Sequence, residues 1–145
     1  MFTYKYPRPA LTVDNVILTR ENEEWYILLI QRKHDPFKNF WALPGGFVDP
    51  DEKIEMAALR ELKEETGITG IKINFLNYFD EPDRDPRERT ISMAFTGTIK
   101  SRIKPQAASD AKKAEWFKID NLPDLAFDHK KIIDFAKLMQ INLSS

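Results

Sequence analysis

The stretch that decides the fold is 46-GFVDPDEKIEMAALRELKEETGI-68. We predict a helix from Asp51 to Thr66, because acids gather at its start behind Pro50 and a glycine follows its end. Asp51 is the expected N-cap, and Gly67 is expected to turn left-handed as the C-cap. The stretch therefore predicts a loop, a helix and a second loop, and the helix carries an unusual run of acids.

Three glutamates, Glu61, Glu64 and Glu65, lie three and four residues apart near the end of this helix. Side chains at that spacing are neighbours, so each like-charge pair costs roughly 0.2 to 0.5 kcal/mol. On a helical wheel the acids share an arc of roughly 120° with Ala57 and Ala58, which leave space beside the carboxylates. A divalent cation resolves the repulsion, and oxygen ligands of this kind suit Mg²⁺ or Mn²⁺. For 60-RELKEETG-67 alone, a solvated helix face remains the alternative.

The longer pattern resembles the signature of the Nudix hydrolases. That signature is a glycine, five residues, a glutamate, seven residues, Arg-Glu, an aliphatic residue, any residue, Glu-Glu, any residue, a glycine and an aliphatic residue. The matching positions are Gly46, Glu52, Arg60, Glu61, Leu62, Glu64, Glu65, Gly67 and Ile68. At background residue usage, a chance match is on the order of one in 10⁸ or rarer per starting position.

The resemblance implies a loop-helix-loop catalytic motif in which Glu61, Glu64 and Glu65 bind Mg²⁺, or Mn²⁺, with help from the backbone around Gly46. Arg60 would support catalysis by orienting a glutamate through a charge-assisted hydrogen bond. The implied reaction is hydrolysis of a nucleoside diphosphate linked to another group, in which water attacks phosphorus within a metal-bridged pyrophosphate.

Outside this stretch, apolar and polar residues alternate as they do in strands. The expected strands are 10–19 and 25–33, joined as a hairpin, and then 71–79, 89–99 and 114–119. The loop from His34 to Gly46 should end in a tight glycine turn, with a short strand at 47–48 after it.

A closing helix should begin at Asp128 as its N-cap. His129 is expected to belong to this helix N-terminus rather than to catalysis. The expected apolar face consists of Ile132, Ile133, Phe135, Ala136 and Met139. The predicted fold class is α/β, a Nudix-type α/β/α sandwich with a mixed sheet flanked by helices, in a single domain over residues 1–145.

Two further segments, 79–95 and 108–133, resemble those of bacterial and archaeal ADP-ribose pyrophosphatases. The resemblance implies that ADP-ribose is cleaved to AMP and ribose 5-phosphate. The candidate substrate-binding residues are Arg84, Arg87, Tyr6 and Phe127, and the candidate loop carboxylate that positions or deprotonates water is Asp110, with Glu88 behind it.

Alternatives stay open for several of these residues. Arg84 and Arg87 either contact substrate or pair with Asp83 and Asp85 to stiffen the loop. Tyr6 either stacks on adenine or lies in an edge strand that packs on the core. The second enzyme hypothesis is a nucleoside-triphosphate pyrophosphohydrolase, and a third is a non-catalytic ADP-ribose sensor. The presence of all three glutamates, and a chain that ends where the domain should end, speak against the sensor.

Composition limits the partners. The chain has 145 residues with 22 basic and 23 acidic side chains, no block of like charge and no cysteine. We therefore expect no nucleic-acid partner and no disulfide framework. No apolar run approaches the roughly 18 residues of a membrane span, so a cytoplasmic location without membrane contact is expected. The partner should be a small nucleotide-sugar substrate, and the resemblance implies a possible homodimer.

Overall fold

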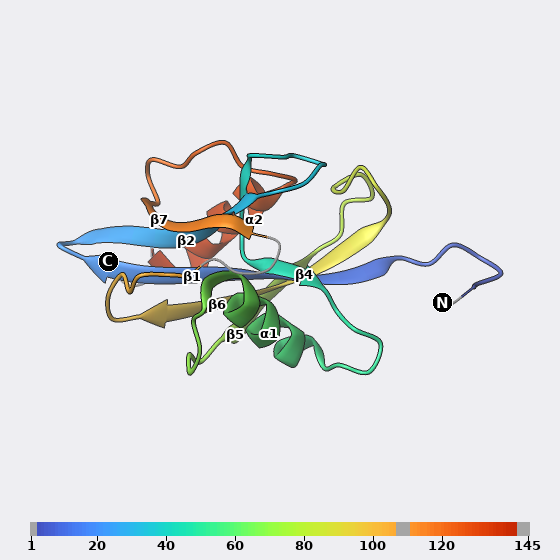
Figure 1. Cartoon of the computed structure of the whole chain (residues 1–145), viewed down its shortest axis with the longest axis horizontal. Coiled ribbons are helices and arrows are strands. Elements are labelled where there is room, and N and C mark those ends of the chain that lie inside the picture. The colour runs from blue at the N-terminus through green and yellow to red at the C-terminus, as the bar shows by residue number, and fades with distance from the viewer. Residues whose placement is uncertain (1–2, 107–110, 142–145) are drawn as a thin grey trace.

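The apolar runs at the start of the chain form an antiparallel hairpin, and the remaining elements assemble around it (Figure 1). The computed structural model describes residues 3–106 and 111–141. The strands are β1 (Ala10–Glu21), β2 (Glu24–Arg32), β3 (Trp41–Ala42), β4 (Gly45–Phe47), β5 (Asn74–Phe79), β6 (Thr90–Ile99) and β7 (Ala111–Lys118). The helices are α1 (Ile54–Thr66) and α2 (His129–Ala136), and a π-helical turn, η1 (Lys137–Ile141), follows α2.

The sheet is mixed and it forks between its first two strands. β1 pairs in parallel with β6 along one edge, and the other strand pairs are antiparallel. On its other edge, β1 pairs with β2 only over residues 18–21, and farther along with β4 over residues 12–14. β2 leaves β1 to pair with β3. The segment from β3 to β4 therefore crosses from one branch of the fork to the other.

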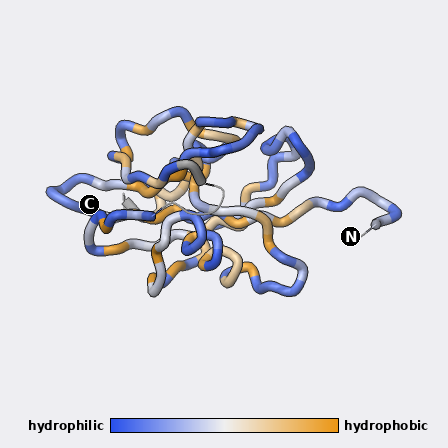
Figure 2. Tube along the Cα trace, in the orientation of Figure 1, coloured by the Kyte–Doolittle hydropathy of each residue, from blue (hydrophilic) through white to orange (hydrophobic). Residues whose placement is uncertain are grey.

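Each face of the sheet is covered by one helix. Alternate residues of β1 point to opposite faces, as the period of a strand requires. Val13 and Ile17 pack with the helix α1, whereas Val16 and Leu18 pack with Ile132 on α2 and its neighbours. Figure 2 shows hydrophobic residues along the central strands and hydrophilic ones along the outer loops. The predicted α/β/α sandwich with a mixed sheet is confirmed.

The start of α1 differs from the prediction. Asp49 to Glu52 forms a turn, with a hydrogen bond of 3.1 Å from the Glu52 N–H to the Asp49 carbonyl, and the helix begins only at Ile54. Asp51 is therefore not the N-cap, which is Lys53, without a side-chain cap bond. The predicted end is confirmed, since Gly67 has φ 78° and its N–H reaches the Lys63 carbonyl.

Two other local predictions are wrong, and one of the two alternatives for Tyr6 is excluded. The two glycines before Phe47 do not form a tight turn, because Gly45 and Gly46 lie extended in β4. Met139 does not complete the apolar face of the closing helix, since it is 47% exposed in the π-helical turn. Tyr6 does not lie in a strand: the segment before β1 projects from the sheet (Figure 1), and Tyr6 is 69% exposed.

Candidate active site

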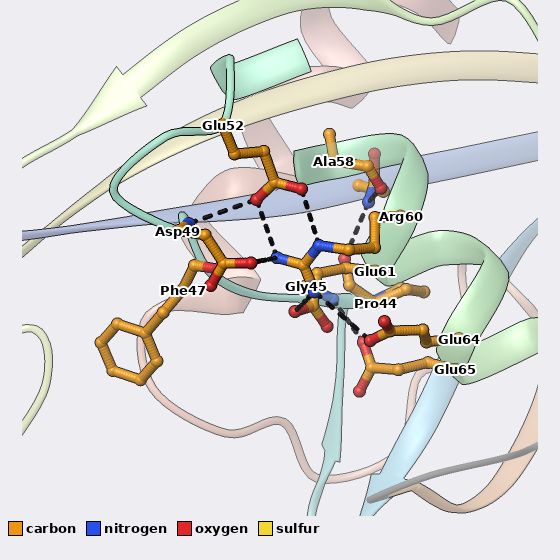
Figure 3. A network of polar contacts seen from close by, with 11 residues as sticks. Pro44, Gly45, Phe47, Asp49, Glu52, Ala58, Arg60, Glu61, Glu64 and Glu65 are labelled. Atoms are coloured by element: carbon orange, nitrogen blue, oxygen red, sulfur yellow. Dashed lines mark hydrogen bonds and ion pairs between the residues drawn. The ribbon is translucent and has the colours of Figure 1, made fainter. Parts of the chain in front are cut away.

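Arg60 organises the acids at the surface of α1, as Figure 3 shows. Its guanidinium donates two hydrogen bonds to Glu52, of 2.7 and 2.9 Å, and one of 2.9 Å to Glu61. A longer contact of 3.3 Å reaches Glu64, whose side chain is 45% exposed. These hydrogen bonds raise the pKa of Arg60, Glu52 contributing most. One cation thus holds the helix and the preceding turn together and offsets part of the predicted repulsion.

Glu65 lies apart from this arginine network. It is buried, and its Oε1 accepts a hydrogen bond of 2.7 Å from the Gly45 N–H. The pKa of Glu65 is raised to about 8, mainly by burial; the charges of Glu61 and Asp14 also raise it, whereas the Gly45 hydrogen bond and the charge of Arg32 lower it. Burial also raises the pKa of Glu61. A nearby divalent cation would favour the ionised form of both acids.

At Gly45 and Gly46 the strand lies too close to its neighbours for a side chain. A Cβ atom added at Gly46 would lie 2.6 Å from Oε1 of Glu61, and one added at Gly45 would lie 2.0 Å from the Val13 carbonyl oxygen. The glycines are therefore needed for close approach between strand and helix rather than for a turn. The carboxylates of Glu61 and Glu65 lie against this strand, and carboxylate oxygens suit a hard divalent ion.

The described residues do not form a ready metal cage. Among 3–106 and 111–141, no three His, Cys, Asp or Glu side chains converge on one point. Glu61 and Glu64 are turned toward Arg60, while Glu65 is turned toward Gly45. The chemistry of these residues fits a divalent ion, and in this structure Arg60 holds one carboxylate oxygen of Glu61 and one of Glu64.

A cavity of about 450 Å³ opens where the sheet forks, within the range typical of small-molecule sites. Both acids and cations line it. The acids include Asp14, Glu61 and Glu65, the cations are Arg32, Lys33, Arg60, Arg84 and Arg87, and Phe47 and Phe127 contribute aromatic rings. Such a cavity offers both a place for a cation and a place for an anionic ligand.

Arg84 and Arg87 both line this cavity, but their partners differ. Arg84 is buried and donates two hydrogen bonds to Asp128, of 3.0 and 2.7 Å, and a third of 3.0 Å to Thr90. Arg87 pairs with Asp85 through bonds of 3.1 and 2.8 Å and remains 44% exposed at its side chain. Arg87 therefore forms an ion pair within its own loop, as one of the two alternatives predicted. Arg84 instead connects the loop to Asp128, the N-cap of α2.

Phe127 lies between two cations. The guanidinium carbons of Arg32 and Arg87 are 4.9 and 5.7 Å from its ring centroid. Arg87 also lies over the Phe47 ring, at 5.6 Å. Burial and the charge of Arg87 lower the pKa of Arg32. Arg32 donates to the Pro36 carbonyl, and no ion pair with a described carboxylate occupies its guanidinium. Two neighbouring cations in one cavity favour an anionic ligand.

Arg32 and Asp14 also line the cavity, although neither was predicted from the sequence as a site residue. Asp14 is 6% exposed and accepts a 2.5 Å hydrogen bond from the Ser92 hydroxyl. Burial raises its pKa. The signal available in the sequence was the pair Asp14-Asn15 within the apolar run of β1, because a buried strand rarely carries an acid without a partner. Arg32 carried no comparable signal.

One predicted site residue is not brought to the cavity, and another lies outside the described residues. Tyr6 is exposed on the segment before β1 and does not line the cavity. Asp110 lies outside the described residues, so its position near the acids stays a prediction. Glu61, Glu65, Gly46, Arg60, Arg84, Arg87 and Phe127 all line the cavity, and Glu64 lies next to it on α1.

Comparison with known proteins assigns the class of this site. The family model described as NUDIX domain matches residues 8–135. The chain belongs to the Nudix hydrolase family, as its loop-helix-loop motif had indicated.

Three similar proteins have names that are more specific than the family. An ADP-ribose pyrophosphatase from Methanocaldococcus jannaschii is 49% identical over 129 residues, which are 88% of this chain and 73% of the relative. An ADPR responsive transcriptional repressor, NtrR, from Acinetobacter baylyi is 35% identical over 92% of this chain, which spans only 56% of the repressor. The NUDIX domain of Shewanella oneidensis NrtR, in a crystal structure with ADP ribose, superposes with a TM-score of 0.86 at 30% identity, covering 92% of this chain and 90% of that one.

Proposed function

We propose that this Nudix hydrolase cleaves ADP-ribose to AMP and ribose 5-phosphate in a reaction that depends on Mg²⁺ or Mn²⁺. The observation that carries the substrate is the 49% identity to an ADP-ribose pyrophosphatase over 88% of the chain. The cavity agrees in chemistry, because it combines acids that suit a divalent ion with cations that suit a diphosphate.

The acids of α1 have distinct proposed roles. Glu61, Glu64 and Glu65 hold the divalent ion, with a backbone carbonyl near Gly46. When bound, the ion supplies Lewis-acid stabilisation of the charge that develops on the pyrophosphate oxygens. Arg60 fixes Glu61 through its 2.9 Å hydrogen bond and is itself held by two bonds to Glu52. Asp110 is proposed as the carboxylate that positions the attacking water.

A cation of the cavity is proposed to bind the substrate diphosphate. Arg32 is the stronger candidate, because no described carboxylate pairs with it, whereas the hydrogen bonds of Arg84 are taken up by Asp128 and Thr90. Arg87 and Phe127 present a charged plane and an aromatic ring that suit a nucleobase or ribose. Arg84 is proposed to hold the cavity wall against α2 rather than to contact the phosphates.

A product assay tests the proposal. Purified protein is incubated with ADP-ribose, ADP-glucose, NADH or 8-oxo-dGTP, with Mg²⁺ or with a chelator, beside the Glu65→Gln variant. We expect ADP-ribose to be the best substrate, AMP to appear, and turnover to vanish with the chelator and with the variant. If 8-oxo-dGTP leads and pyrophosphate appears, the triphosphate pyrophosphohydrolase alternative replaces the proposal.

A second candidate function is ADP-ribose sensing without turnover. The observation that favours it is the similarity to the ADPR responsive repressor and to the NrtR domain bound to ADP ribose. Calorimetry with ADP-ribose, followed by analysis of the recovered nucleotide, separates the two functions. Binding with intact ADP-ribose after incubation with Mg²⁺ would support the sensor.

The remaining partner assignments are also proposals. A nucleotide sugar is the proposed small-molecule partner, without a nucleic-acid partner, and a homodimer is proposed for solution, where light scattering would measure it. A cytoplasmic location is proposed as well. None of the helices in the described part of the chain is long and apolar enough to span a membrane.

A further inference from the structure

The crossover between β3 and β4 passes between the two helices, and its backbone amides are divided between them. Leu43 is buried and its N–H donates a 3.0 Å hydrogen bond to Nδ1 of His129, the first residue of α2. Pro44 has no N–H. The Gly45 N–H donates a 2.7 Å hydrogen bond to Oε1 of Glu65 on α1. The two consecutive donors of this segment therefore point in opposite directions, one to each helix.

The carbonyl between these donors is fixed as well. The Pro44 oxygen accepts hydrogen bonds from the backbone N–H of Asn15, at 2.8 Å, and from its side-chain amide, at 3.2 Å. The same amide also donates to the Ala58 carbonyl on α1, at 3.0 Å. Leu43, Pro44 and Gly45 are thus each held by a hydrogen bond, and the anchor at Leu43 is the one that α2 supplies.

Nδ1 of His129 accepts a hydrogen bond and does not donate one. A backbone N–H points at that nitrogen, so the proton of the neutral ring lies on Nε2. Nε2 is 3.3 Å from Oδ1 of Asp14, whose other oxygen takes the Ser92 hydroxyl. The imidazole is buried, at 4% exposure, so solvent does not replace either partner. Asp14 and Ser92 thus fix the tautomer in which His129 can accept from Leu43.

We propose that His129 is a positioning residue for the reaction: by accepting the Leu43 N–H, it sets the crossover so that the Gly45 N–H holds the Glu65 carboxylate in its working orientation. This inference rests on the proposed hydrolase function. His129 is one of the residues that line the cavity, and its positioning effect acts through Leu43, Pro44 and Gly45. Partners that orient a ligand side chain typically change metal affinity or activity by about 10- to 100-fold when they are removed.

Two substitutions separate the two hydrogen bonds of the ring. In His129→Asn, Oδ1 lies the same number of bonds from Cα as Nδ1 of histidine, so it can still accept the Leu43 N–H while the donor to Asp14 is lost. In His129→Gln, Nε2 lies the same number of bonds from Cα as Nε2 of histidine, so it can donate to Asp14 while the acceptor for Leu43 is lost. Ile133→Val, buried on the same helix, is the matched control for loss of packing.

Steady-state kinetics with ADP-ribose and Mg²⁺ is the first measurement, at a temperature where all variants are folded. We expect kcat of His129→Gln to fall by about 10- to 100-fold, with KM changed less than about threefold, and His129→Asn and Ile133→Val to stay within about threefold of wild type. Equal losses in the Asn and Gln variants, or a larger loss in Asn, would overturn the proposal. A kcat equal to that of the wild type in both His129 variants would also overturn it.

Nuclear magnetic resonance of the metal-free protein gives a readout that does not require turnover. A coupling across the hydrogen bond should connect the Leu43 amide nitrogen to Nδ1 of His129. The Gly45 amide should be slow to exchange in the wild type and in His129→Asn, and at least about tenfold faster in His129→Gln. Unchanged exchange in the Gln variant overturns the positioning role. If the wild type shows this coupling but does not turn over ADP-ribose, the result counts against the proposed function and not against the hydrogen bond.

Discussion

Glu65→Gln should stabilise the metal-free protein, although it removes a residue proposed for catalysis. The amide keeps an oxygen that can accept the Gly45 N–H and lacks the charge that burial disfavours. In the folded protein the pKa of Glu65 rises from 4.5 to about 8. At about 1.4 kcal/mol per unit, this rise corresponds to a cost of about 5 kcal/mol once the carboxylate is fully ionised.

The sign of the pH dependence follows from the raised pKa. Below pH 4.5, Glu65 is protonated in both the folded and the unfolded chain, so it contributes no difference between variant and wild type. As pH rises, the unfolded chain loses this proton first, and the wild type loses stability until the pH passes about 8. The variant should therefore equal the wild type near pH 4 and exceed it by about 3 to 5 kcal/mol at pH 9.

Urea denaturation with a chelator present, repeated from pH 4 to pH 9, measures this difference. Glu64→Gln is the matched control, because it removes the same charge from the same helix at a side chain that is 45% exposed. The control should stay within about 0.5 kcal/mol of wild type at every pH. A difference for Glu65→Gln that does not grow with pH, or a variant less stable than wild type at pH 9, would refute the reasoning.

Three further predictions concern other residues of the cavity. Gly46→Ala should lower kcat by about 10- to 100-fold, because the added Cβ would lie 2.6 Å from Oε1 of Glu61 and displace that carboxylate. The melting temperature should change little, because the end of a side chain can move. Steady-state kinetics measures kcat, and calorimetry measures the melting temperature. Arg84→Met should cost about 3 to 5 kcal/mol in urea denaturation, since it leaves Asp128 unpaired, and adding Asp128→Leu should recover much of the loss. Arg32→Gln should raise KM for ADP-ribose about tenfold with kcat within about threefold, and an unchanged KM would remove Arg32 from the phosphate site.

The sequence predicted the parts of the site that lie on one helix. Glu61, Glu64 and Glu65 are close because the period of an α-helix makes them close, and no knowledge of the rest of the fold is needed. The sequence also predicted both helix ends to within a few residues. The start moved from Asp51 to Ile54 because the proline-containing acidic segment forms a turn, in which Glu52 is free to bind Arg60.

The residues opposite the helix could not be predicted in the same way. His129 contacts Leu43 across 86 positions, and Arg84 contacts Asp128 across 44 positions. Those contacts depend on where the sheet forks, and hydrophobic alternation does not set this point, because both branches are equally apolar. For the same reason, the sequence identified His129 as part of a helix N-terminus, which is confirmed, and missed its acceptor role.

The glycines of β4 show a different limit of sequence reasoning. Gly45 and Gly46 suggested a tight turn, since glycine is the residue that most readily adopts unusual backbone angles. The structure uses them for close approach, with no room for a side chain at the Val13 carbonyl or at Glu61. Composition alone does not distinguish these two uses, because both require only that the side chain be absent.

The distribution of partners among the acids of α1 suggests how a divalent ion would affect stability. Arg60 already neutralises part of the charge on Glu61 and Glu64, so an ion that binds them must compete with existing hydrogen bonds. Glu65 accepts its hydrogen bond from the Gly45 N–H rather than from a cation, and neither that bond nor the charge of Arg32 keeps its pKa from rising to about 8. An ion that requires ionised carboxylates must displace the proton of Glu65 below about pH 8, so metal binding should strengthen as the pH rises toward that value. The crossover orients Glu65 through the Gly45 N–H and so acts on this same step.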